Sequence, residues 1–292
     1  MEWKPEGEPR AVVQISHGMV EYVERYDRFA RFLNEAGIVV VGNDHLGHGL
    51  SVNNEEEFGY FGENEPSKTV VDDLYQVTLK MKKKYEGIPY FVLGHSMGSF
   101  LIRRYIMNYG SFVDGVIIMG TGSTPAPMLW GAKRFVSIVR RLKGSTYRSV
   151  ICDRLCFGNY NKRIHPVRTE KDWLTKDEQI VDRYLKDPMC TFLFTTNGYH
   201  TLLSTISFIQ KKENIDKIPK DLPVYLVAGE DDPVGNYGRG VKKVYEIYKH
   251  KNIQDIELKL YKGDRHELVN ETDYEVVYQD ILSWIEKRIH NI

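Results

Sequence analysis

The sequence predicts an α/β fold in which helices cover both faces of a mostly parallel sheet, and three observations carry this prediction. Four runs are almost continuously apolar, as strands buried on both faces of a parallel sheet must be. Segments with apolar residues at helical spacing separate these runs. The same alternation returns near the end of the chain, after a long helical stretch. The expected strands are residues 11–15, 38–41, 90–93, 116–119, 224–228 and 256–260.

The connections between these strands predict two crossover helices and one C-terminal helix. Apolar residues recur at helical spacing over residues 22–36, and Gly37 follows where a left-handed helix end is expected. A second apolar stripe covers residues 70–81. The last helix is expected to begin at a capping box formed by Thr272 and Glu275.

The chain divides into a core and an insertion. After Gly122 the strand pattern stops, and residues 123–218 carry helical patterns rich in aromatic side chains. We expect this segment to be a helical cap that contains the substrate-binding residues, which no pattern identifies one by one. The core then comprises residues 1–122 and 219–292. The strict alternation of residues 256–260 predicts an edge strand with one face in water.

Composition and charge limit the kinds of partner. The 292 residues are 42% hydrophobic and 27% charged, which is typical of a folded enzyme. Forty basic and forty acidic residues give a formal net charge of zero, so no nucleic acid partner is expected. No run approaches the roughly 18 apolar residues of a membrane span, which favours a cytoplasmic protein with, at most, transient contact with membrane surfaces. A small molecule is the expected partner, no cofactor is expected, and the oligomeric state stays open.

A strand, a sharp turn and a helix meet at Ser96. The run 90–93 leads into Gly94-His95-Ser96-Met97-Gly98, and residues 99–109 continue as an apolar helix. Because the glycines on both sides leave room in the turn, the serine can be held in a strained backbone with its hydroxyl exposed. This context predicts a nucleophile elbow, and a glycine-rich turn with a structural serine is the alternative.

A serine nucleophile needs a histidine base and an acid that orients the histidine. The order expected on such a fold is serine, acid, histidine. Only His250, His266 and His290 follow the candidate acids. His250 ends a lysine-rich helical stretch and His290 lies in the C-terminal tail, whereas His266 follows strand 256–260 directly. We therefore predict that His266 is the base.

Three carboxylates compete for the role of the acid. Glu230, Asp231 and Asp232 all follow strand 224–228. We choose Asp232, because the residue before Pro233 is held in an extended conformation that aims its side chain outward. Asp231 remains the alternative acid.

Two backbone amides are expected to stabilise an oxyanion. One belongs to Met97, the residue after the nucleophile. The other is expected at Met19, in the loop after strand 11–15, where Gly18 keeps the loop clear of the substrate. A simple strand-to-helix turn is the alternative interpretation of this loop.

Two further clusters contain metal-binding residue types, yet neither predicts a metal site. Residues 43–51 include two histidines and an aspartate, but short loops of this composition more often bond their own backbone, so we expect a structural turn. Cys152, Cys156 and His165 lack a fourth ligand and the tight spacing of a zinc site. Together with Cys190, these cysteines are expected to be reduced thiols.

Five motifs in order along the chain resemble those of one known family. They are His17-Gly18-Met19 with Glu21 and Tyr26, Asp44-x-x-Gly47-His48-Gly49-x-Ser51, Gly94 to Gly98, Gly229 to Pro233, and Asp264-x-His266-Glu267. The chain resembles the monoacylglycerol lipases and bacterial lysophospholipases, lid-bearing serine hydrolases of the α/β-hydrolase fold that include aminopeptidase-like members. This resemblance implies a triad of Ser96, Asp232 and His266, amide donors at Met19 and Met97, and a cap that forms an acyl tunnel. Residues 187–195 also resemble bacterial lysophospholipases.

The expected function is hydrolysis of lipophilic carboxylic esters such as monoacylglycerols or lysophospholipids. An aminopeptidase or amidase is the first alternative. It would need a cap carboxylate to hold the ammonium group of its substrate, and Glu170, Asp172 and Asp182 cannot be placed from the sequence. A non-catalytic binding protein of the same fold is the second alternative, and the complete set of three catalytic groups argues against it.

Overall fold

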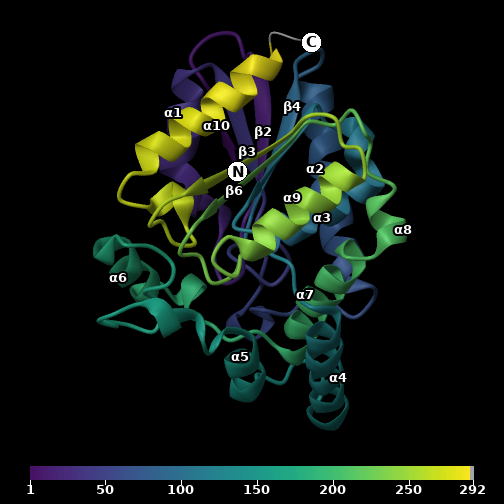
Figure 1. The fold of residues 1–292 in the computed structure, drawn as a ribbon, viewed down its shortest axis with the longest axis vertical. Coiled ribbons are helices and arrows are strands. Elements are labelled where there is room, and N and C mark those ends of the chain that lie inside the picture. The colour runs from purple at the N-terminus through teal and green to yellow at the C-terminus, as the bar shows by residue number, and fades with distance from the viewer. Residues whose placement is uncertain (290–292) are drawn as a thin grey trace.

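The computed structural model describes residues 1–289 and contains one seven-stranded sheet (Figure 1). Its strands are β1 (Glu2–Trp3), β2 (Ala11–Ser16), β3 (Ile38–Gly42), β4 (Tyr90–His95), β5 (Gly115–Met119), β6 (Val224–Gly229) and β7 (Ile256–Tyr261). They lie in the order β1-β3-β2-β4-β5-β6-β7. All neighbours are parallel except β1, which pairs antiparallel with β3. The predicted mostly parallel sheet and its six predicted strands are therefore confirmed, and β7 is the predicted edge strand.

This strand order brings the carboxyl ends of β2 and β4 together. From β2 the chain moves outward to β3, and it then crosses back to form β4 on the other side of β2. Ser16 of β2 pairs with Gly94 of β4, so the loops that follow these two strands leave the sheet side by side. Open parallel sheets bind their ligands at such a reversal of strand order.

Helices cover both faces of the sheet, as the sequence predicts. Figure 1 shows α1 (Asp27–Glu35) and α10 (Tyr274–Ile289) on one face. On the other face lie α2 (Pro66–Lys84), α3 (Met97–Tyr109) and α9 (Arg239–His250). Two hydrophobic cores result, because side chains of each buried strand point alternately into one helical layer and the other.

The chain between β5 and β6 is helical. It forms α4 (Ala126–Lys143), α5 (Val150–Phe157), α6 (Glu178–Lys186), α7 (Thr196–Ile209) and α8 (Lys212–Ile215). In Figure 1, α4 and α5 lie below the sheet, whereas α8 lies beside it. Short 3-10 turns occur at Val23–Tyr26, Glu55–Glu57, Gly110–Phe112, Tyr160–Arg163, Pro188–Cys190 and Leu268–Asn270. Helix α7 packs against α2, α3 and α4, which anchors the insertion on the core. None of the helices in the described part of the chain combines the length and the apolar character needed to cross a bilayer.

Three local features differ from the expectation or go beyond it. Strand β1 has only two residues, too few for any periodic pattern, and no strand is predicted there. The first crossover helix begins later than expected, because residues 23–26 form a 3-10 turn before α1. The predicted capping box at Thr272 is wrong. Helix α10 begins at Tyr274, directly after Asp273, while the Thr272 amide donates to the Glu271 carboxylate over 3.2 Å.

Candidate active site

Ser96 stands at a tight turn between β4 and α3. Its backbone has φ 54° and ψ −119°, a strained conformation for a residue with a side chain. The turn fits because its neighbours are glycines. A Cβ on Gly98 would lie 1.9 Å from the Ser16 carbonyl oxygen, and one on Gly94 would lie 2.4 Å from the Gly98 carbonyl oxygen. The structure thus contains the predicted elbow, with Ser96 partly exposed at its tip.

His266 approaches the same point from the loop after β7. The Ser96 amide donates to the carbonyl oxygen of Met119 over 3.0 Å, and Gly120 follows directly. A Cβ on Gly120 would lie 3.2 Å from Cε1 of His266. The rings of His95 and His266 are 4.7 Å apart between centroids. The serine and the histidine, far apart in the sequence, therefore gather at the carboxyl end of β5.

Asp232 is the carboxylate that the structure brings to His266. Its Oδ1 lies 3.0 Å from Nδ1 of His266, and its side chain is fully buried. The angle at Nδ1 of His266 does not satisfy the criteria for a hydrogen bond to Asp232, as is common in active sites without substrate. Glu230 and Asp231 are exposed instead. Nε2 of His266 is buried and has no hydrogen-bond partner among residues 1–289, which leaves this atom free for a substrate-side proton.

Two amides at this point have no acceptor in the described part of the chain. They belong to Met19 and Met97, the predicted oxyanion donors. The amide of Gly18 is already engaged, because it donates to Oε1 of Glu21 over 2.5 Å. A Cβ on Gly18 would lie 3.1 Å from Cβ of Ser96, so this loop runs directly beside the serine. The close approach explains why the position next to Met19 is a glycine.

A buried charged network lies behind the serine and the histidine. Nδ1 of His95 is 3.1 Å from Oε1 of Glu21, and Nε2 of His95 is 3.2 Å from the His266 carbonyl oxygen. Arg25 donates to Oε2 of Glu21 over 2.9 Å and makes two bonds of 2.9 and 2.7 Å to Glu267. The network therefore holds the backbone of His266 and the side chain of the next residue.

Opposite charges determine the protonation of this network. Burial alone would lower the pKa of His95, but its hydrogen bond to Glu21 and the charge of Glu21 raise that pKa. Burial would likewise raise the pKa of Glu21, yet His95 and the guanidinium of Arg25 lower it. No pattern in the sequence predicts a role for His95, Arg25 or Glu267. Arg25 and Glu267 are 242 positions apart, so no local pattern joins them.

The loop of residues 43–51 is the expected structural turn. Asp44 accepts hydrogen bonds from the amides of Val23 and Leu50, each over 2.8 Å. The Ser51 hydroxyl donates to the Asp44 carbonyl oxygen over 2.7 Å. His48 is buried beside this turn, with Nδ1 3.0 Å from the Leu46 carbonyl oxygen. The aspartate thus bonds to backbone groups of its own surroundings.

The remaining candidates are two histidines and three cysteines. His250 is exposed at the end of α9, and His290 lies outside the described residues. Cys152, Cys156 and Cys190 are free thiols.

The fold and the geometry at Ser96 define a serine hydrolase of the α/β-hydrolase type. The chain belongs to the serine aminopeptidase S33 family, whose family model matches residues 7–273.

Relatives and solved structures of known description support this assignment. The human protein described as monoglyceride lipase is 28% identical over 98% of this chain and 86% of its own length. A monkeypox virus protein described as a monoglyceride lipase homolog is 27% identical over 98% of this chain and 93% of its own. The crystal structure of a thermostable carboxyl esterase from Bacillus coagulans, with glycerol, matches with a TM-score of 0.91 and 30% identity over 99% of this chain and 93% of that one.

Proposed function

We propose that this protein hydrolyses lipophilic monoacyl esters through an acyl-enzyme formed on Ser96. The observation that carries the proposal is the convergence of three elements on one point. The strained serine after β4, the imidazole after β7 and the buried Asp232 after β6 all meet at the carboxyl edge of the sheet. This is the arrangement that activates a serine hydroxyl at neutral pH.

In the proposed acylation step, Nε2 of His266 takes the proton of the Ser96 hydroxyl while the oxygen attacks the ester carbonyl carbon. The carbonyl oxygen becomes an oxyanion, which the free amides of Met19 and Met97 stabilise. His266 then gives its proton to the alkoxide, the ester C–O bond breaks, and the alcohol leaves. Asp232 holds the imidazole in the required tautomer and stabilises its charged form.

Deacylation repeats these steps with water. His266 takes a proton from a water molecule, the resulting hydroxide attacks the acyl carbon, and the same two amides stabilise the second oxyanion. The bond from the acyl carbon to the Ser96 oxygen breaks, the serine regains its proton from His266, and the carboxylic acid departs.

An apolar acyl chain suits the surroundings of the site. The Trp173 ring lies 5.0 Å from the His266 ring, and Tyr160 meets Trp173 edge-on at 4.8 Å. The names of the human and viral relatives, both described in terms of monoglyceride lipase, favour monoacylglycerols within this class. Lysophospholipids belong to the same chemical class. We further propose that residues 123–218 act as a cap over a core formed by residues 1–122 and 219–292.

The carboxylates of the insertion argue for an ester over a peptide substrate. An aminopeptidase needs a carboxylate that can receive the substrate ammonium group. Asp172 instead accepts from the amides of Arg168 and Thr169 over 2.5 and 3.0 Å. Asp182 pairs with Arg168 over 2.6 Å, and Glu170 lies 3.9 Å from Lys171. All three carboxylates weighed for this role therefore have partners of their own.

Covalent labelling tests the nucleophile. A fluorophosphonate probe should label the native protein once, and Ser96→Ala should abolish the label. Ser123→Ala is the matched control, because Ser123 lies in the loop after β5 and contacts Gln210. If Ser96→Ala is still labelled at the native rate, another residue is the nucleophile and the proposal fails.

A substrate panel tests the bond that is cut. p-Nitrophenyl esters of two to sixteen carbons, monoacylglycerols and lysophospholipids should be compared with an aminoacyl anilide under the same conditions. We expect kcat/KM to rise with acyl length and the anilide to remain uncut. Activity on the anilide alone would exclude the ester function.

A further inference from the structure

A segment of the insertion, Asp172–Lys176, lies against the loop that carries His266. The carbonyl oxygen of Trp173 accepts the His266 amide over 3.4 Å, and that of Leu174 accepts the Glu267 amide over 2.7 Å. The Thr175 hydroxyl donates to the carbonyl oxygen of Asn270 over 3.0 Å. The insertion thus bonds to the backbone on both sides of the histidine side chain.

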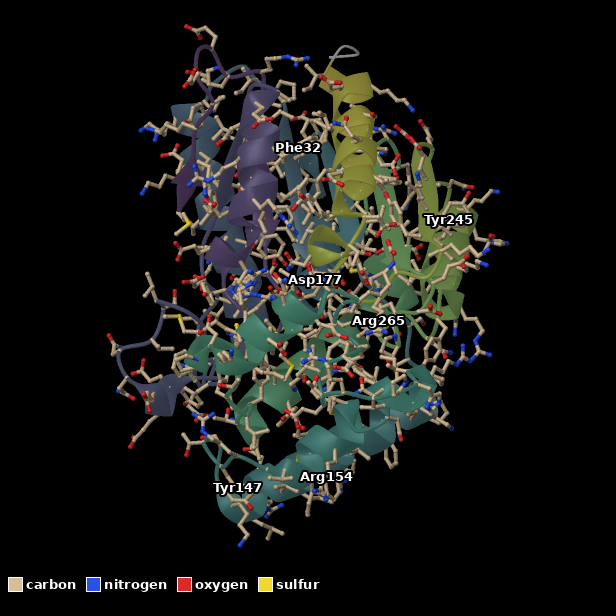
Figure 2. The ribbon with its side chains drawn as sticks, turned by 90° about the vertical axis from the view of Figure 1, so that its left-hand side faces the viewer. Phe32, Tyr147, Arg154, Asp177, Tyr245 and Arg265 are labelled. Atoms are coloured by element: carbon tan, nitrogen blue, oxygen red, sulfur yellow. The ribbon has the colours of Figure 1, made fainter. Side chains whose placement is uncertain are left out.

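Arg265, the residue before His266, extends this contact. Its guanidinium donates to the carbonyl oxygens of Asp172 and Thr175 over 2.6 and 3.1 Å. Its own amide donates to Oε1 of Glu271 over 2.8 Å. Figure 2 shows Arg265 at the level where the sheet half meets the insertion, whereas Tyr147 lies at the far end of the insertion.

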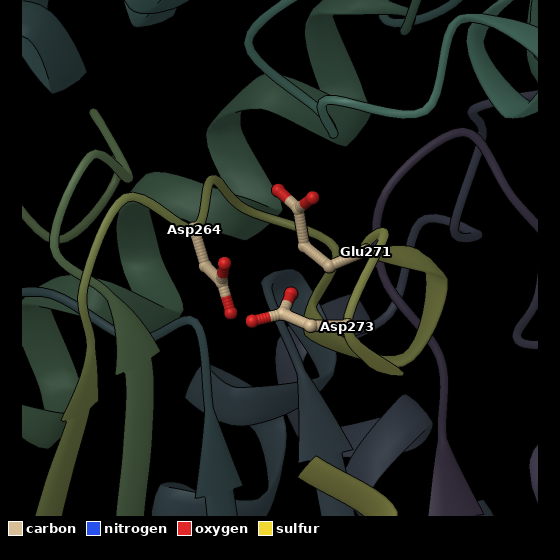
Figure 3. Close-up of side chains that lie close together, drawn as sticks. All are labelled: Asp264, Glu271 and Asp273. Atoms are coloured by element: carbon tan, nitrogen blue, oxygen red, sulfur yellow. The ribbon is translucent and has the colours of Figure 1, made fainter. Parts of the chain in front are cut away.

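Lys176 joins the segment to three carboxylates of the core. Figure 3 shows the side chains of Asp264, Glu271 and Asp273 gathered at the end of the histidine loop. The Lys176 ammonium nitrogen lies 2.6 Å from Asp264, 3.8 Å from Glu271 and 3.7 Å from Asp273. These distances identify the cation of the cluster as a side chain of the insertion, and a metal ion would have to displace it.

The ion pair matters because two of the three carboxylates, Asp264 and Glu271, are buried. Asp264 is fully buried, and burial raises the pKa of both Asp264 and Glu271. Without a cation, like charges would face each other in a medium that screens them poorly. An exposed ion pair contributes little to stability, but loss of one partner of a buried pair leaves an uncompensated charge. The position of Asp264 therefore depends on Lys176.

We propose that the segment Asp172–Lys176 positions His266 for proton transfer, with Lys176 as its key positioning residue. Lys176 fixes Asp264, two residues before the histidine, while the backbone bonds of Trp173 and Leu174 fix the histidine and the residue after it. The proposal rests on the proposed function, since it assigns the insertion a part in orienting the catalytic base. In consequence, displacement of this segment misaligns His266.

Lys176→Met tests the inference, because methionine keeps much of the side-chain volume and loses the charge. We expect the rate of Ser96 phosphonylation by the fluorophosphonate, and kcat on a short soluble ester, to fall about 10- to 100-fold, since a misplaced catalytic group costs rate. KM should stay within about twofold, because no group that binds the substrate changes. Lys176→Arg should restore most of the rate.

Two comparisons make the test decisive. Lys171→Met is the matched control, since Lys171 belongs to the same part of the insertion but lies 3.9 Å from Glu170, away from the histidine loop. It should leave the rates unchanged. If Lys176→Met lowers the melting temperature but is labelled by the fluorophosphonate at the native rate below that temperature, the positioning role is overturned while the proposed function stands. A native protein that is not labelled at Ser96 would instead overturn the proposed function itself.

Discussion

At the scale of single residues, Asp231 and Asp232 are neighbours in the sequence but lie in opposite environments. Asp232 is fully buried with Oδ1 3.0 Å from His266, and Asp231 is exposed. Asp232→Asn should lower kcat by about 10⁴-fold, because the amide no longer holds the required tautomer. Asp231→Asn should change kcat by less than about twofold. Steady-state kinetics on one soluble ester would compare kcat in the two variants. An equal loss of kcat in both would contradict the assignment of Asp232, and not Asp231, as the acid of the triad.

Gly120 provides a second residue-scale prediction. Its φ is +60°, and a Cβ there would lie 3.2 Å from His266. Gly120→Ala should cost about 1 kcal/mol of stability for the left-handed backbone and should also displace the imidazole. Gly62→Ala is the matched control, because Gly62 has φ +82° with nothing within 4 Å of a Cβ.

Thermal melts and kcat should separate these two effects. Both alanine variants should melt earlier by similar amounts, while only Gly120→Ala loses rate. Equal kcat values in the two variants would mean that a side chain at position 120 does not displace the imidazole of His266.

The residues that the sequence could suggest are those with a local pattern. Ser96 stands between two glycines at a strand end, and His266 follows an expected strand. The partners of Arg25 could not be found in this way, because Glu267 reaches it only after the sheet has folded. No sequence pattern around Trp173 predicts its contact with His266, because an aromatic residue in the insertion could equally belong to the core.

At the scale of elements, strands are more predictable than the contacts of the insertion. A strand buried on both faces must be apolar along its length, so the composition of β2 or β4 already indicates its environment. The segment Asp172–Lys176 forms no helix or strand of its own. Its role depends on backbone bonds to a loop about ninety positions away, which no periodicity encodes.

Helix α6 is stabilised by a cap that can be tested. The Asp177 side chain accepts from the amides of Gln179 and Ile180 over 2.9 and 3.1 Å. Asp177→Ala should destabilise the protein by about 1 kcal/mol, which corresponds to a melting temperature lower by about 2–4 °C. Asp177→Asn keeps an oxygen acceptor and should melt within about 1 °C of the native protein. If the Asp177→Ala variant melts at the same temperature as the native protein, the Asp177 cap does not contribute to stability.

At the scale of the whole molecule, the order of the strands creates the site. The reversal at β2 places the loops after β2 and β4 together, and the later strands β5, β6 and β7 deliver the partners of Ser96 in turn. The general architecture could be predicted because alternating strands and helices admit few arrangements. The exact convergence of five loops on one point is a property of the folded sheet.

Three buried histidines make the stability of the fold depend on pH in the acid range. His17, His45 and His48 lie together beside the loops after β2 and β3, with ring centroids 4.2 to 6.5 Å apart. Burial, the largest cause, lowers the pKa of all three, that of His48 to about 3. In the pH range from the ordinary value of 6.5 down to about 3, the unfolded chain therefore binds a proton at His48 that the folded protein does not. The contribution of His48 to stability therefore falls as the pH falls through this range.

His48→Phe isolates the contribution of one histidine, because phenylalanine fits among Phe61, Phe192 and Phe194 and does not titrate. At pH 7.5 both proteins are neutral at this position, so their difference in free energy of unfolding measures packing together with the loss of the contact between His48 and the Leu46 carbonyl oxygen. Between pH 6 and pH 4, the stability of the native protein relative to the variant should decline by about 1.4 kcal/mol per pH unit. Urea unfolding at several pH values would measure this slope. A constant difference across the range would mean that His48 is protonated in the folded protein as readily as in the unfolded chain.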